Sequence, residues 1–249
     1  MENSMQHLKE LLGKAIQIAD ATEKYYHIEA IEQYYSSYNL WLRYSPIPSR
    51  PILERAWFEA GILAETSVFL AVHGFYEQAC AILRMQLDGF LTRFYWDTLD
   101  KRAELESYTI VDRLTNGYWE WERGEAKDYP RINKVWLTLR KEKYFDSFDR
   151  QYNLRMNIEN QNQLLHKYIH GRPPSRHYPG ATRSSRINIK FEKRHFDEWF
   201  GLFKSAYNLM TIMSVLLYPD YLKCPSWHKF ILLEPERLNQ INMTINIKD

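Results

Sequence analysis

The chain has 249 residues, 45% of them hydrophobic and 26% charged, and its formal net charge at pH 7 is only +2. This length suits one large domain or two small ones, and the composition is ordinary for a globular protein. Because the net charge is so small, no global electrostatic field calls for a nucleic-acid partner.

The cysteine content and hydropathy pattern favour the cytosol. Cys80 and Cys224 are too few for a disulfide framework or a zinc-finger set. The N-terminal sequence MENSMQHLKELLGKA is amphipathic and lacks the apolar centre of a signal peptide. No uninterrupted apolar run approaches the roughly 18 residues of a membrane span. We therefore expect a cytoplasmic protein that does not enter the membrane.

The first predicted unit covers residues 1–50. Apolar side chains at helical spacing predict one long helix, or two in tandem, between residues 4 and 44. The segment SPIPSRP at residues 45–51 ends this region, because its three prolines remove helix donors and fix φ. We expect residues 1–50 to pack on a core formed by residues 51–218.

Two strongly apolar helices are predicted next, over residues 52–72 and 75–99. The short turn His73-Gly74 between them predicts an antiparallel hairpin. On one edge of the second helix, Arg84 and Asp88 are four residues apart and can form an ion pair.

Further helices are predicted over residues 101–123, 131–148 and 191–217. Residues 219–249 contain Pro225 and Pro235 after the helix-ending Pro219, together with the β-prone sequence INMTINI, which predicts either a docked arm or a disordered end. No stretch shows the alternation and turn density of a sheet protein. The predicted fold is an all-α, single-domain bundle of six to eight helices with one long basic loop.

Residues 157–190 combine a polar helix, a sharp stop and dense charge. His166 and His170 are four residues apart, and Gly171 suits a helix C-terminal cap. When the segment before Gly171 is laid out as a helix at about 100° per residue, a stripe of polar residues lies beside a stripe of apolar residues. The apolar stripe holds Leu154, Ile158, Leu165 and Ile169, and the polar stripe holds Arg155, Glu159, Asn162, His166 and His170.

The loop that follows is strongly basic, with Glu192 as the sole acid between Lys167 and Arg194. Arginine predominates, which suits bidentate contact with phosphate. The pattern predicts binding of RNA or single-stranded DNA, and its alternative is a solvated loop that only keeps the protein soluble. The candidate nucleic-acid-binding residues are Arg172, Arg176, Arg183 and Arg186.

The order of these features resembles a family. AILRMQLDGF at residues 81–90 and LLHKYIHGRPPS at residues 164–175, with the basic loop and a long last helix, are similar to a broad group of all-helical prokaryotic proteins distantly related to HEPN domains. The resemblance covers roughly residues 52–218. It implies a helical bundle, often dimeric, in cytosolic conflict systems such as toxin–antitoxin pairs or phage defence. The Arg-then-His spacing of active HEPN ribonucleases is matched only by Arg172 and His177, across two prolines in the loop.

The two histidines suggest metal-independent cleavage of RNA. Such cleavage needs a base for the 2′-hydroxyl and an acid for the leaving oxygen, and histidine titrates near neutrality. An arginine would stabilise charge on the scissile phosphate. The candidate catalytic residues are therefore His166, His170 and Arg84, with no metal and no cofactor.

Two other interpretations of the histidines stay open. Both side chains can be ordinary residues at the edge of the core, with satisfied hydrogen bonds. The pair can also hold a divalent ion together with Glu77, Glu159 or Asp88.

The sequence thus predicts a nucleic-acid-associated conflict or defence protein, with ribonuclease activity as the sharper hypothesis. The alternative is a non-catalytic interaction or scaffold protein that acts by oligomerising or by binding a protein partner. We expect a homodimer, since twofold dimers are the commonest oligomers. The Trp119–Trp121 pair marks either core or a partner surface.

Overall fold

The computed structural model describes residues 2–25, 28–43, 50–106, 117–125, 130–169, 190–223 and 232–246. Within these ranges every regular element is helical, which confirms the all-α class. The elements are α1 (Glu2–Tyr25), α2 (Ile28–Arg43), α3 (Pro51–Val72), α4 (Tyr76–Glu106), α6 (Ile132–Leu139), α7 (Phe145–Tyr152), α8 (Leu154–Ile169), α9 (Lys193–Leu217), the 3₁₀ helix η1 (Pro219–Lys223) and α10 (Pro235–Asn246). Residues 117–122 are helical as well.

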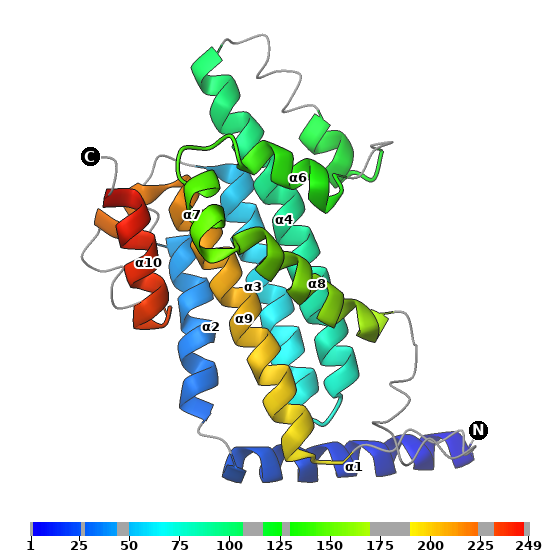
Figure 1. Cartoon of the computed structure of the whole chain (residues 1–249). Helices are drawn as coiled ribbons and strands as arrows, with labels where there is room; N and C mark the ends of the chain where they lie inside the picture. The colour runs from blue at the N-terminus through cyan, green and yellow to red at the C-terminus, as the bar shows by residue number, and fades with distance from the viewer. Residues whose placement is uncertain are drawn as a thin grey trace.

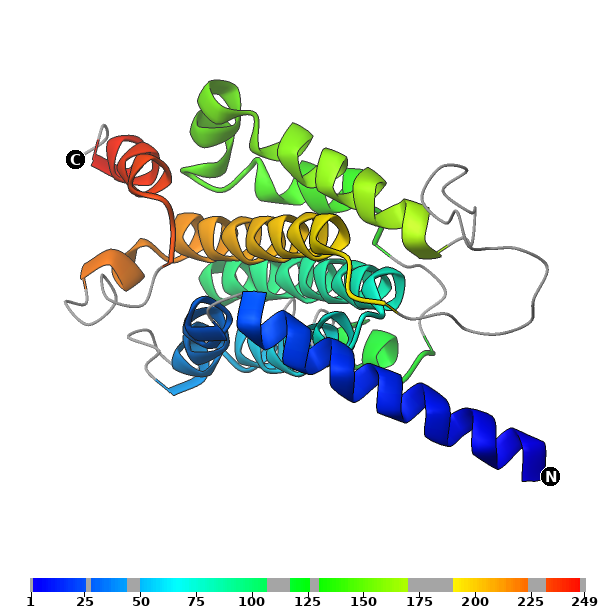
Figure 2. The same ribbon diagram turned by 90° about the horizontal axis from the view of Figure 1, so that it is seen from below.

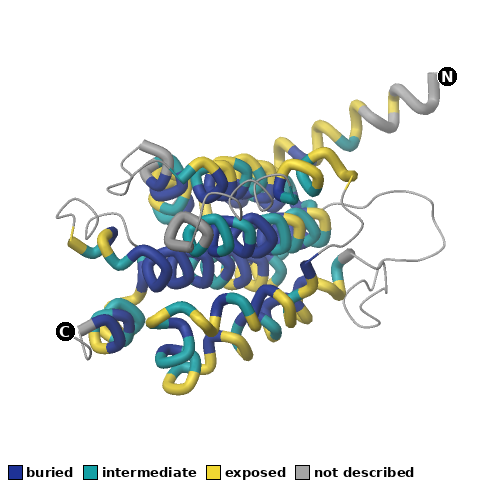
Figure 3. The backbone as a smooth tube through the Cα atoms, turned by 90° about the horizontal axis from the view of Figure 1, so that it is seen from above, coloured by how far each residue is buried: buried dark blue, intermediate teal, exposed yellow. Residues whose placement is uncertain are grey.

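The central layer consists of α2, α3, α4 and α9, which run side by side (Figure 1). The helix α8 crosses α4 and α9 obliquely, and α6 packs against α4. The helix α1 lies across one end of the layer and extends beyond it, as the view from below shows (Figure 2). Burial is concentrated in the central helices, while much of α1 is exposed (Figure 3).

The predicted hairpin of α3 and α4 is present, and its ends follow from local chemistry. Pro51 begins α3, where a missing N–H costs nothing, and Glu54 accepts a hydrogen bond from the Arg50 main-chain N–H at 3.3 Å. Gly74 adopts φ +84° in the turn, where a side chain would also press on Ile18 and on the Lys190 carbonyl. The turn is therefore also a docking point for α1 and for the start of the last long helix.

Two buried tryptophans join α3 to α9 in antiparallel register. The indole N–H of Trp57 on α3 donates to Ser214 Oγ on α9 at 3.2 Å. The indole N–H of Trp199 on α9 donates to Ser67 Oγ on α3 at 2.9 Å. Ser67 in turn donates to the Ala79 carbonyl of α4 at 2.9 Å. The helices α3, α4 and α9 are thus aligned by hydrogen bonds between polar groups that need partners because they are buried.

One hydrophobic cluster joins side chains of α2, α3, α4, α6, α7, α8, α9 and α10. The expected N-terminal unit contributes Tyr38 and Trp41, and Trp41 stacks on Trp57 with ring centroids 4.3 Å apart. The expected C-terminal arm contributes Ile241 and Ile245. The helix α1 adds a separate small cluster in which Ala15 and Ile18 pack near Phe75 and Phe191.

The helices found in the described residues outnumber the six to eight that the sequence predicted, for two reasons. The single helix predicted over residues 131–148 is two helices, α6 and α7, separated by a turn at residues 140–144. The β-prone tail forms α10, because Ile241, Thr244 and Ile245 face the core at helical spacing and Pro235 suits a first helical position.

The helix α9 is the one described helix that is long and apolar enough to cross a membrane, but 72% of its most apolar window is buried in the bundle. A core helix has this character. Its neighbour in sequence, Tyr218, is extended before Pro219, which explains where α9 ends.

A buried carboxyl group lies where α4 meets the end of α9. The Tyr218 hydroxyl donates to Asp97 Oδ2 at 2.6 Å, while Oδ1 has no hydrogen-bond partner within the ranges that the structure describes. Burial raises the pKa of Asp97 to about 7, against the opposing effects of the Tyr218 hydrogen bond and the Arg50 charge. The folded state therefore binds a proton on Asp97 between about pH 4 and pH 7 that the unfolded state has released.

This protonation predicts a pH-dependent effect of Asp97→Asn. The contribution of Asp97 to stability is fully present below pH 4 and is lost as the pH rises to about 7. The variant should therefore gain stability relative to the wild type across this window, by at most about 4 kcal/mol. Urea unfolding at a series of pH values measures the difference. Tyr218→Phe removes a hydrogen bond to the charged form and should move the transition to higher pH. If the unfolding free energies of Asp97→Asn and the wild type changed in parallel with pH, the raised pKa of Asp97 would be contradicted.

Candidate functional site

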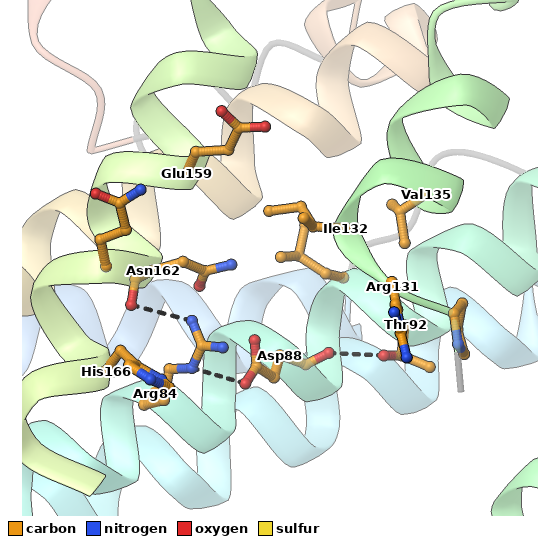
Figure 4. A pocket seen from close by; sticks show the side chains of 12 residues that line it. Arg84, Asp88, Thr92, Arg131, Ile132, Val135, Glu159, Asn162 and His166 are labelled. Atoms are coloured by element: carbon orange, nitrogen blue, oxygen red, sulfur yellow. Dashed lines mark hydrogen bonds and ion pairs between the residues drawn. The ribbon is translucent and has the colours of Figure 1, made fainter. Parts of the chain in front are cut away.

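A cavity of about 530 Å³ lies between α4, α6 and α8 (Figure 4). Its wall on α8 includes Glu159, Asn162 and His166 of the predicted polar stripe. Its wall on α4 is the edge that carries Arg84 and Asp88. Pro130 and the start of α6 close the third side. The lining residues are Arg84, Asp88, Leu91, Thr92, Pro130, Arg131, Ile132, Val135, Glu159, Asn162, Gln163 and His166.

Arg84 spans the gap between the two main walls. Its Nε lies 2.7 Å from Asp88 Oδ2, and its Nη1 donates to the main-chain carbonyl of Asn162 at 3.1 Å. The first contact is the predicted i,i+4 ion pair on α4. The second ties α4 to α8, so the guanidinium is held in place on the cavity floor, as Figure 4 shows.

Asp88 is a carboxyl group with altered acidity. Burial raises its pKa above the ordinary value, and the Arg84 charge and hydrogen bond and the charge of His166 oppose this effect. A raised pKa makes the ionised carboxylate a stronger proton acceptor than an exposed aspartate. Since His166 acts on the same pKa, the imidazole and the carboxyl group are electrostatically coupled across the cavity.

His166 lies in the last turn of α8 and is exposed at the cavity wall. Leu165 beside it is buried, as are Leu154 and Ile158, so these three residues of the predicted apolar stripe face the core. The burial of that stripe orients α8 and thereby turns His166 toward the α4 edge. In Figure 4 His166 and Arg84 lie next to each other.

Asn162 is the most unusual polar group of the site. The residue is only 8% exposed, and its buried side-chain Oδ1 has no hydrogen-bond partner among the described residues. Its side chain points into the cavity (Figure 4). A water molecule or a ligand that enters the cavity and donates a hydrogen bond would satisfy this acceptor.

The remaining charges are divided between the rim and the neighbouring helices. Arg131 is exposed at the start of α6 and adds a second cation to the rim. Glu159 is paired with Arg155 at 2.8 Å, and Arg155 also donates to Asn133 at 3.1 Å. The glutamate is thus tied to a cation outside the cavity, and the charged side chains inside it are those of Arg84 and Asp88.

Of the predicted site residues, Arg84 and His166 are brought together, although they are distant in sequence. His170 and the four candidate loop arginines, Arg172, Arg176, Arg183 and Arg186, lie outside the described residues. Glu77 does not line this cavity. The sequence places Asp88 beside Arg84 and among the candidate metal ligands, and it places Asn162 on the polar stripe, but it assigns neither residue a role in RNA cleavage. The signal for Asp88 was its position on the Arg84 edge.

The arrangement supplies two coupled titratable groups beside fixed and rim cations. It can bind an anion and transfer protons to and from it. Within the described part of the chain, no group of three or more His, Cys, Asp or Glu side chains is placed to hold a metal ion.

Comparison of the chain with protein-family models, with curated proteins and with solved structures finds no match.

The unpartnered oxygen of Asn162 predicts a contrast with its neighbour on α8. Gln161 is also buried, but its Nε2 donates to the Leu202 carbonyl at 2.9 Å. Gln161→Leu should therefore lose about 1 kcal/mol more unfolding free energy than Asn162→Leu, which removes an acceptor that the protein leaves unsatisfied. Urea unfolding of the two variants measures this difference. Equal losses would mean that the Asn162 side chain is already satisfied within the fold.

Proposed function

We propose that the chain binds RNA and cleaves it without a metal ion at the cavity between α4, α6 and α8. The observation that carries the proposal is the convergence of Arg84, Asp88 and His166 from two helices into one cavity. A phosphodiester needs a fixed cation and two proton-transferring groups, and these three side chains are of those types. In a conflict or defence setting, such an activity would act as a toxin on cellular or phage RNA.

The proposed reaction is a transesterification. Asp88 takes the proton of the ribose 2′-hydroxyl, and the 2′-oxygen attacks phosphorus. His166 gives a proton to the departing 5′-oxygen, so the P–O5′ bond breaks and leaves a 2′,3′-cyclic phosphate and a 5′-hydroxyl. Arg84 and Arg131 bind the non-bridging oxygens, which carry more charge in the transition state. The imidazole must be protonated and the carboxyl group ionised at the start.

The basic sequence after α8 supports the same proposal, because it provides residues that can bind RNA. His166 is in the last turn of α8, and Arg172 follows six positions later in the chain. Arginines so near the cavity in sequence would hold the RNA backbone by ionic contacts that release counterions. The proposal assigns binding to these arginines and chemistry to the cavity.

Purified protein and labelled RNA should give cleavage that persists in a chelator. Asp88→Asn and His166→Ala should each lower the rate about 10²- to 10⁴-fold, because each removes a proton-transfer group. The rate should rise with pH through the pKa of Asp88, which burial places above the ordinary carboxyl value. A gel assay of products against pH measures both effects.

The controls separate binding from chemistry. The quadruple variant with Arg172, Arg176, Arg183 and Arg186 changed to Glu should weaken RNA binding and its salt dependence while leaving the rate at saturating RNA close to that of the wild type. His170→Ala tests the second predicted histidine. Cleavage that survives Asp88→Asn and His166→Ala together would place the chemistry elsewhere, and no cleavage by the wild type would reject the enzyme.

A second candidate function is that of a non-catalytic interaction protein, and one observation favours it. The outward face of α3 exposes Phe58, Ile62 and Phe69 by 46%, 48% and 61%. They lie on one side of the helix at helical spacing. Large apolar side chains gathered on one helix face are typical of an interface. We propose that this face joins two copies of the chain.

The dimer proposal predicts a mass of about twice 30.1 kDa in solution. Ile62→Lys with Phe69→Lys should reduce the mass to that of one chain, because a charge in an apolar contact is costly to bury. Folding should be little affected, since both side chains are exposed. Met243→Lys changes an equally exposed apolar side chain on α10 and serves as the control. Light scattering at micromolar concentration decides, and a wild-type monomer would reject the interface.

A further inference from the structure

A second cavity, of about 510 Å³, lies on the opposite side of α8. Successive residues of a helix are about 100° apart, so the side chains of α8 that line the two cavities point in nearly opposite directions. Asn162 and His166 face the first cavity, while Asn157 and Gln161 face the second. The helix α9 forms the other wall, and α10 lies beyond it near α7 (Figures 1 and 2). No step proposed above uses this cavity.

Part of the floor of the second cavity is apolar, while polar atoms make up the larger share of the lining. The apolar part is formed by buried side chains of Phe148, Leu154, Leu209 and Ile212. A ligand that fits this lining has an apolar portion beside several polar groups. The size falls in the range of roughly 300–1,000 Å³ that holds a ligand with an apolar body and a few polar groups.

The walls offer hydrogen-bond acceptors. The amide nitrogen of Asn157 donates to the Tyr152 carbonyl at 3.2 Å, and that of Gln161 donates to the Leu202 carbonyl. These bonds fix both carboxamides, so each retains its oxygen as an acceptor. The Oδ1 atom of Asn208 on α9 is buried and has no hydrogen-bond partner in the described part of the chain. A ligand that fits this wall donates N–H groups.

The rim carries positive charge from two helices. Lys204 of α9 and Arg237 of α10 line the cavity, with Glu234 as the acidic residue of the lining. Arg237 uses Nη1 to donate to Gln240 at 2.9 Å, which leaves further donors on the guanidinium. Two cations on one rim favour a ligand with an anionic group.

We propose that this cavity binds a nucleotide whose base carries an exocyclic amino group. The base lies on the apolar part of the floor, the amino group donates to the Asn208 oxygen, and the phosphate meets Lys204 and Arg237. Cytosine and uracil form a matched pair for this purpose, because an amino donor on one replaces a carbonyl acceptor on the other. The inference does not rest on the cleavage proposed above.

Titration calorimetry with CMP, UMP, cytidine and ribose 5-phosphate tests the proposal. CMP should bind at least tenfold more tightly than UMP, and ribose 5-phosphate should not bind. Asn208→Leu should reduce the CMP preference to less than twofold. Lys204→Gln with Arg237→Gln, two changes on the rim that leave the core intact, should lower CMP affinity to that of cytidine. AMP, which also carries an amino group, should bind like CMP.

Arg131→Ala is the matched control, because Arg131 is exposed on the rim of the first cavity and should leave CMP affinity unchanged within twofold. In this variant, tighter binding of tetracytidylate than of CMP would assign the nucleotide to an RNA chain, and equal binding would assign a free nucleotide. Equal affinity for CMP and UMP, or CMP binding that Arg131→Ala abolishes, overturns the inference. If CMP does not bind but RNA is cleaved in the presence of a chelator, the inference is overturned and the proposed function stands. If CMP binds but RNA is not cleaved, the inference stands and the proposed function is rejected.

Discussion

The fold depends on two buried indole N–H groups and the serines that accept from them. A tryptophan fills much core volume, but its N–H must find a partner when it is removed from water. Trp57 finds Ser214 and Trp199 finds Ser67, so each of α3 and α9 donates one bond to the other. A shift of either helix would leave a buried donor unsatisfied, at about 1–3 kcal/mol each. The antiparallel register of α3 and α9 is therefore fixed by polar chemistry within an apolar core.

The helix α8 forms a wall of both cavities, and its position depends on how α4 and α9 are aligned. The helix packs its apolar stripe, including Ile158 and Leu165, into the groove between α4 and α9. Its polar flanks are then forced outward, one toward the Arg84 edge and one toward Asn208. Arg84 and Gln161 each bond to a main-chain carbonyl of the opposing helix and hold α8 at both sides. The same packing thus orients two sets of polar side chains in opposite directions.

The fold was more predictable from the sequence than the site was. Long apolar periodicity and turn residues predicted α3, α4 and α9, since these signals are local. The docked arm that the sequence offered as one alternative for the tail is present as α10, but its helical conformation was not predicted, because the β-prone composition of INMTINI conceals the helical spacing of Ile241 and Ile245. The sequence also placed His166 beside an apolar stripe. It did not say that α8 would pack on the Arg84 edge, because periodicity tells which face is buried and not against which helix. The side-chain oxygens of Asn162 and Asn208 become buried and unsatisfied only when several helices pack together. The sequence pattern alone therefore could not predict them.

The order of the elements has a consequence for synthesis of the protein. The α3–α4 hairpin is complete when the ribosome has passed Glu106, and its contacts are local, so it can form early. Its inner face, however, is covered by α9, and the serine that accepts from Trp57 is Ser214. Until that residue leaves the ribosome, the nascent hairpin presents aromatic surface and an unpaired indole N–H to solvent or to a chaperone. A chain truncated before α9 would remain in that state, with an apolar surface that favours aggregation.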